Sequence, residues 1–244
     1  MSETPPEPLL AHVLDGGQIV GTLRKLQARI HERFPGSGLS QVCADLVIRG
    51  EGIVRLAAQL ARPNWGLRIL IGGILAAALA GLLFLILHIH LSDLERTNMV
   101  DIAQGTDATV NLLLLAAAGA WFFLNLEQRL KRARIHAALS ELRAIAHVVD
   151  MHQLTKDPTV VLQEFTPTAA SPKRRAMSEF ELARYLDYCA EMQSLIAKLA
   201  ALFQRANDDP EVGDEVADVE RLTSELGRKI WQKITIIGQL AARP

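Results

Sequence analysis

The sequence predicts an all-α membrane protein, in which a two-span transmembrane helical hairpin is joined to a cytosolic helical bundle. Two apolar runs, 67–91 and 110–126, each approach the roughly 20 apolar residues that a helix needs to cross the hydrocarbon core of a bilayer. Elsewhere, apolar residues recur at the three- and four-residue spacings of a helix face. No alternating apolar run competes as a strand.

Composition agrees with a chain that meets both lipid and water. Half of the 244 residues are hydrophobic and 22% are charged, and the mean hydropathy is +0.17. The net charge of -1 gives no global attraction to nucleic acid, whose binders usually carry a concentrated basic surface, so we expect no nucleic-acid partner. Both cysteines, Cys43 and Cys189, fall in segments expected to face the reducing cytoplasm, where structural disulfides are rare.

The first part of the chain divides into a tail and two cytosolic helices. Residues 1–8 are rich in Pro and Glu and predict a disordered tail, and residues 9–65 predict N-terminal cytosolic helices. The first helix should end at Pro35 and Gly36. Its apolar stripe is Ile19, Leu23, Leu26, Ile30 and Phe34. In the second helix, Gly50-Glu51-Gly52 interrupts the stripe and predicts a kink or a break.

The two spans are expected at 66–91 and 109–127, with a short external loop at 92–108. Basic residues close to a span stay on the cytoplasmic side. They stand before the first span and after the second, at Arg49, Arg55, Arg62, Arg68, Arg129, Lys131, Arg132 and Arg134. Both termini should therefore be cytoplasmic, in what we expect to be a bacterial inner (plasma) membrane.

After the second span, a helical stripe continues without a breaker, which predicts a cytosolic extension over 128–156 and a connector over 157–177. A C-terminal antiparallel helix pair is expected over 178–244. Its first helix begins at a capping box, Ser178-x-x-Glu181, and its second at Asp209-Pro210.

Small residues in the spans predict close helix packing. Gly73, Ala77 and Gly81 share one face of the first span, and Ala116 and Ala120 form a matching row on the second. Packing within one hairpin and assembly between chains both fit this pattern. We expect the two together, and hence a homo-oligomer.

A group of potential metal ligands lies at 147–157. His147, Asp150, His152 and Asp157 have side chains that suit a divalent transition metal. In a continuous helix, however, His152 points away from His147 and Asp150, because each residue turns the helix by about 100°. A hydrogen-bonding cluster at the helix end is the preferred interpretation, and no cofactor is predicted.

Two features suggest contact with lipid headgroups. Lys173, Arg174 and Arg175 form a basic triplet suited to an anionic leaflet, although a solvated loop explains them equally well. Trp231 stands among basic residues near the chain's end, where packing in the bundle is the simpler alternative to lying on the membrane.

No phosphate-binding loop, zinc-protease motif or nucleophile elbow occurs, so no catalytic residues are predicted. The first hypothesis is a non-enzymatic membrane anchor or scaffold that oligomerises and presents its bundle to an unidentified cytosolic protein. The alternative is a subunit of a small oligomeric ion channel or transporter, for which Asn111 and Asn125 are the polar pore candidates. A membrane enzyme, resting on the His147 to Asp157 group, comes third.

Overall fold

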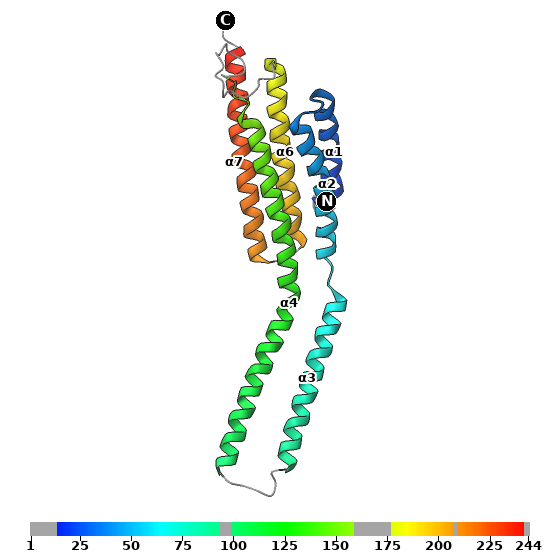
Figure 1. Cartoon of the computed structure of the whole chain (residues 1–244), viewed down its shortest axis with the longest axis vertical. Helices are drawn as coiled ribbons and strands as arrows, with labels where there is room; N and C mark the ends of the chain where they lie inside the picture. The colour runs from blue at the N-terminus through cyan, green and yellow to red at the C-terminus, as the bar shows by residue number, and fades with distance from the viewer. Residues whose placement is uncertain (1–13, 93–98, 159–176, 207–208, 242–244) are drawn as a thin grey trace, which may run out of the picture. The chain divides into compact units, whose positions relative to one another are not determined.

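The computed structural model describes residues 14–92, 99–158, 177–206 and 209–241. Within these ranges the chain is helical, with turns and caps between helices and no strand, so the all-α prediction is confirmed there (Figure 1). The chain separates into two compact units. One combines Met1–Ala61 with Ile135–Pro244, and the other is Arg62–Arg134.

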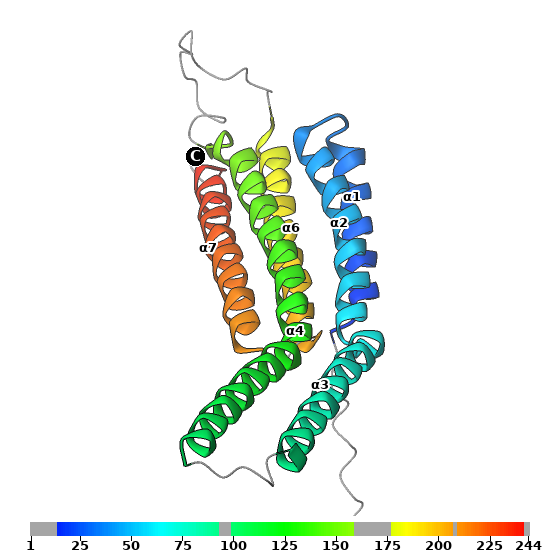
Figure 2. The same ribbon diagram turned by 60° about the horizontal axis from the view of Figure 1, so that its bottom comes forward.

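The first unit is a helical bundle. It contains α1 (Gly16–Arg33), α2 (Gly38–Leu60), the part of α4 (Met99–Leu154) from Ile135 onward, α6 (Glu179–Ala206) and α7 (Pro210–Ala241). Helix α6 packs along α7, α1 pairs with α2, and both α1 and α2 contact α6 (Figures 1 and 2). Helix α4 contacts α2 through the Arg49–Glu141 ion pair at 2.6 Å, and it contacts α7 through a hydrogen bond between His136 and Glu215 at 2.8 Å.

Local signals fix the turn between α1 and α2. The chain leaves α1 through Phe34 and Pro35 into Gly36, whose φ of 67° lies in the left-handed region that favours glycine. Ser37 then caps α2, because its side chain accepts a hydrogen bond from the Ser40 backbone N–H at 3.2 Å. The predicted end of the first helix is therefore confirmed.

Helix α2 runs unbroken through Gly50-Glu51-Gly52, so the expected kink or break there is wrong. Gly50 is buried, and a Cβ at this position would lie 3.3 Å from a Leu199 methyl and 3.4 Å from a Leu23 methyl. The missing side chain thus lets α2 approach α6 and α1 closely. Glycine costs about 1 kcal/mol in a helix interior, and this close packing offsets that cost.

The starts of α6 and α7 match the predicted caps. The Ser178 hydroxyl accepts from the Glu181 backbone N–H at 3.2 Å, while the Ser178 backbone N–H donates to the Glu181 carboxylate at 2.9 Å. At α7, the Asp209 carboxylate accepts from the Glu211 backbone N–H at 3.0 Å. These bonds satisfy backbone donors that have no partner inside the helix.

One continuous apolar core fills the bundle. Its fully buried members from α1, α2, α4 and α6 include Leu23, Leu26, Leu39, Leu46, Ile135, Leu142, Leu186, Ile196 and Phe203. Phe34 packs edge-on against Tyr185 and Tyr188, with ring centroids 5.4 Å and 6.3 Å apart. Edge-to-face aromatic pairs of this kind add about 0.5–1.5 kcal/mol beyond the area that they bury.

The second unit contains α3 (Trp65–Ser92) and the part of α4 up to Arg134. Asn64 caps α3 by accepting from the Leu67 backbone N–H at 3.3 Å. Helix α4 already begins at Met99, so residues 99–108 are helical, whereas the sequence placed them in the external loop. The physical reason is that 99–108 contains no proline and one glycine, Gly105, and a single glycine does not stop a helix.

Among the described residues, one stretch within Gly38–Gly81 is long and apolar enough to cross a membrane. Its 18-residue apolar window has a mean hydropathy of 1.4 and is 6% buried. Helix α2 is extensively buried in the core, so this exposed window belongs to α3. Insertion of this stretch into a membrane remains a prediction, and so does the second span.

Candidate functional sites

The second unit carries an extensive exposed apolar surface. Ile69 and Phe84 of α3 and Leu115 of α4 are each 71% exposed. Further exposed members are Leu70, Ile74, Leu79, Leu83, Leu87, Val110, Leu114, Trp121, Phe122 and Leu124. Soluble monomers rarely expose contiguous apolar patches of more than a few hundred Å². The described residues of the chain leave this surface uncovered.

The predicted small-residue rows lie on this open surface. Gly73, Ala77, Gly81 and Ala116 are exposed and Ala120 is partly exposed. A Cβ added at Gly73 or Gly81 would meet no described atom within 4 Å. The single chain therefore does not use these two glycines for contact between its own described helices, and their role in packing stays a prediction.

A carboxylate cluster ties the start of α3 to α4. The side chain of Glu127 is 11% exposed and accepts hydrogen bonds from Arg68 Nε at 2.8 Å and from the Asn64 backbone N–H at 3.2 Å. Lys131 Nζ lies 3.0 Å from Glu127 Oε1, the oxygen that also accepts from Asn64, and it donates to the Arg62 carbonyl at 3.2 Å. Three donors, one each from α3, α4 and the residue before α3, thus converge on one acid.

Sequence reasoning missed Glu127. The signal was available, because Glu127 is an acid that directly follows the apolar run and stands at the head of a strongly basic segment. Its partner Arg68 lies 59 residues away in the chain, however, and no spacing rule connects the two.

The two pore candidates differ in their surroundings. Asn111 is exposed, whereas the Asn125 amide donates to the Trp121 carbonyl of its own helix at 2.7 Å. Four residues after Asn125, Arg129 lies over the Phe122 ring at 5.5 Å. A basic residue stacked on an aromatic ring at the end of an apolar segment is typical of an anchor at a membrane interface.

The potential metal ligands near the end of α4 take part in a hydrogen-bonded cluster. Gln153 donates to the Asp150 carboxylate at 2.6 Å, and Lys233 of α7 donates to the Gln153 side-chain oxygen at 2.6 Å and to its carbonyl at 2.9 Å. Burial lowers the pKa of Lys233, although Asp157 and Asp150 act in the opposite direction. This is the contact pattern of a helix-terminal polar cluster.

The two histidines do not join Asp150. His147 is exposed, and the ring of His152 lies against Gly38, where burial lowers its pKa. Within the part of the chain that the structure describes, no three His, Cys, Asp or Glu side chains come together as a metal site. Metal binding by His147, Asp150, His152 and Asp157 therefore gains no geometric support.

Of the two predicted lipid contacts, only Trp231 lies within the described residues. Lys173, Arg174 and Arg175 lie outside the described residues. Trp231 of α7 is 58% exposed, so its ring is available at the surface of the bundle. Contact of Trp231 with a membrane stays a prediction.

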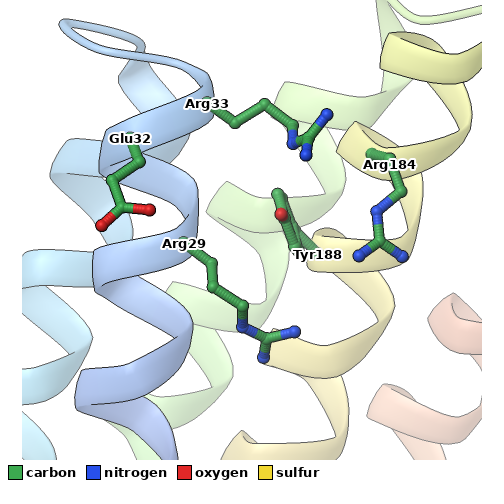
Figure 3. Close-up of a pocket in the computed structure, with 5 residues that line it drawn as sticks. All are labelled: Arg29, Glu32, Arg33, Arg184 and Tyr188. Carbon is green, nitrogen blue, oxygen red and sulfur yellow. The ribbon is translucent and has the colours of Figure 1, made fainter.

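A pocket of about 410 Å³ opens between α1 and α6 (Figure 3). Its lining, here called the arginine pocket, consists of Arg29, Glu32 and Arg33 from α1 and Arg184 and Tyr188 from α6. In the sequence, Arg29, Arg33 and Arg184 stand off the apolar stripes of their helices, on faces that look solvated. Nothing in the sequence shows that these polar faces meet.

The comparisons with known proteins identify no related family or structure. No protein-family model, curated protein or solved structure matches the chain.

Proposed function

We propose that the protein is a non-enzymatic integral membrane anchor or scaffold that oligomerises and presents its helical bundle to a cytosolic protein partner. The observation that carries this proposal is the contrast between its two units. The bundle buries its apolar stripes in one core, while Ile69, Phe84 and Leu115 in the other unit are each 71% exposed. A lipid bilayer is the covering that such helices require.

The dimensions fit this covering. Helix α3 has 28 residues, which at 1.5 Å per residue gives about 42 Å, longer than the roughly 30 Å hydrocarbon core. Transfer of one fully exposed Leu, Ile or Phe side chain out of water contributes about 1.5–3 kcal/mol. Because α3 exposes several such side chains, transferring them into a bilayer is more favourable than leaving them in water.

The polar cluster at Glu127 supports the same proposal. Arg68 stands at the edge of the predicted first span, where a long basic side chain can reach the headgroups. Its ion pair with Glu127 at 2.8 Å joins the start of α3 to α4. Both spans then enter the bilayer from one side, together with the basic residues that favour the cytoplasm.

A fractionation experiment tests membrane insertion. We expect the full chain to stay in the membrane pellet through an alkaline carbonate wash and to be released by detergent. Release into the carbonate supernatant contradicts an integral anchor.

A matched pair of substitutions tests assembly between chains. Ala77 lies at the centre of the Gly73–Gly81 row and Ala78 lies about 100° around the helix, and both are exposed. We expect Ala77→Ile to reduce the native mass measured in mild detergent and Ala78→Ile to leave it unchanged. A monomeric wild-type protein, or equal effects of the two changes, contradicts oligomerisation through this row.

The partner is tested separately. Affinity capture with the full chain in detergent should retain a cytosolic protein that is lost when α6 and α7 are covered by a cross-linked antibody fragment. If the cytosolic protein is still captured when α6 and α7 are covered, presentation by the bundle is contradicted.

A further inference from the structure

The arginine pocket gathers three cations around one aromatic ring. Arg29 and Arg184 lie over the Tyr188 ring at 5.6 Å and 5.5 Å from its centroid. Figure 3 shows Arg29, Arg33 and Arg184 around Tyr188, while the Glu32 carboxylate points away from them. Tyr188 itself is 2% exposed, so the guanidinium groups form the accessible part of the pocket.

Two of the three arginines are already held in place. Arg29 makes a two-pronged contact with the Glu191 carboxylate, and Arg184 pairs with Asp187 at 2.8 Å. The hydrogen bond to Glu191 raises the pKa of Arg29 further above its usual value. These contacts fix the guanidinium planes, so a ligand that uses their remaining N–H donors loses little side-chain entropy on binding.

Arg33 is different. Its contact is with the Phe180 ring, 5.1 Å from the centroid, and no described carboxylate forms an ion pair with it. Arg33 is itself exposed, so it is open to solvent beside this ring. The pocket therefore has one cation without a compensating carboxylate, next to two that are oriented by their neighbours.

We propose that the arginine pocket binds the oxyanion group of a small ligand, a phosphate or a carboxylate, with Arg33 as its principal contact and Arg184 as the second. Guanidinium forks match the planar, two-oxygen geometry of both groups. The volume of about 410 Å³ lies at the lower end of the range for small-molecule sites and holds more than a bare phosphate ion. This inference goes beyond the proposed anchor function and does not rest on it.

Calorimetric titration of the full chain in detergent, at about 20 mM salt, tests the proposal with two probes, pyrophosphate and citrate. The variants are Arg33→Gln and Arg184→Gln. Arg221→Gln on α7 is the matched control, because Arg221 also pairs with an aspartate three residues away, Asp218, at 3.1 Å. A thermal scan of each variant verifies that the bundle is folded.

We expect measurable binding of one probe, weakened about tenfold by Arg33→Gln and by Arg184→Gln, because each loses a charge-assisted contact. The control should stay within about twofold of the wild type, and Arg33→Lys should lie between the two because it keeps the charge but loses the fork. Tighter binding of pyrophosphate identifies phosphate as the group, and tighter binding of citrate identifies carboxylate.

Salt provides a second readout, since raising it to about 200 mM should weaken binding through screening. Failure of both probes to bind the wild-type protein overturns the proposal. Equal losses in the Arg221→Gln control, or unchanged binding in Arg33→Gln, overturn it as well.

Discussion

Replacing Glu127 with glutamine removes the carboxylate on which Arg68, Lys131 and the Asn64 backbone converge. The shape of the side chain is nearly unchanged, so the substitution isolates the loss of charge. The Lys131 side chain, which is 17% exposed, then keeps its cation without that partner. The joint between the start of α3 and α4 should loosen.

The expected loss of stability depends on how exposed the partners of the ion pair are. Breaking a buried ion pair costs about 3–5 kcal/mol, whereas an exposed pair is worth about 0–1 kcal/mol. Glu127 and Lys131 belong to the first class, but Arg68 is 54% exposed and counts little. We therefore expect Glu127→Gln to lower the free energy of unfolding by about 2–3 kcal/mol.

Thermal unfolding in one detergent, followed by circular dichroism, measures this effect. For a chain of this size, 1 kcal/mol shifts Tm by roughly 2–4 °C, so the expected drop is roughly 4–12 °C. The matched control is Glu141→Gln, whose partner is Arg49 and whose side chain is 56% exposed, with an expected shift of at most about 4 °C. Equal shifts in the two variants would refute the reasoning.

Three further outcomes concern the bundle. Phe203→Ala deletes a fully buried side chain and should cost about 3–5 kcal/mol, against less than about 0.5 kcal/mol for Ile48→Ala, which changes a residue 68% exposed. Burial raises the pKa of the Cys43 thiol to about 12, so the free energy of unfolding should fall as pH rises from about 9 toward 12. In a pH series of thermal scans, Cys43→Ala should make this fall less steep. Gln193→Leu should change stability by about 1 kcal/mol or less, because it removes both the hydrogen bond that Gln193 Nε2 donates to the Ala146 carbonyl at 2.9 Å and a buried side-chain oxygen that has no hydrogen-bond partner within the described structure.

The direction of the pH effect follows from linkage. The folded state holds the Cys43 thiol protonated, while the thiol of the unfolded chain ionises near the ordinary cysteine pKa of 9.0. Between these values the unfolded state binds fewer protons, so rising pH favours it. A slope unchanged by Cys43→Ala would contradict this origin of the pH dependence. A large loss of stability in Gln193→Leu would contradict the small effect expected for that substitution. Equal costs for Phe203→Ala and Ile48→Ala would contradict the packing of the core.

Much of the bundle could be predicted because its signals are local. The spacing of Leu23, Leu26 and Ile30 marks a buried helix face without knowledge of its partner. The caps at Ser178 and Asp209 involve residues two or three positions apart, so the sequence contains both members of each hydrogen bond.

The remaining features depend on contacts between distant segments. Gly50 resembles a helix breaker in sequence, and only the approach of Leu199 and Leu23 explains why the helix continues. Glu127 meets Arg68 across 59 residues. The arginine pocket joins α1 to α6, whose contact between Arg29 and Glu191 spans 162 residues. Polar faces show periodicity but not which polar faces meet.

Membrane topology is the most direct test of the proposed anchor. In a chain with Cys43→Ala and Cys189→Ala, single cysteines are introduced by Ser92→Cys, at the end of α3, and by Ser224→Cys, at an exposed position of α7. Intact bacterial cells are treated with a membrane-impermeant maleimide. We predict that Ser92→Cys is labelled from outside and that Ser224→Cys is labelled only after permeabilisation. Labelling of Ser224→Cys in intact cells, or of Ser92→Cys only after permeabilisation, would contradict a hairpin with both termini in the cytoplasm.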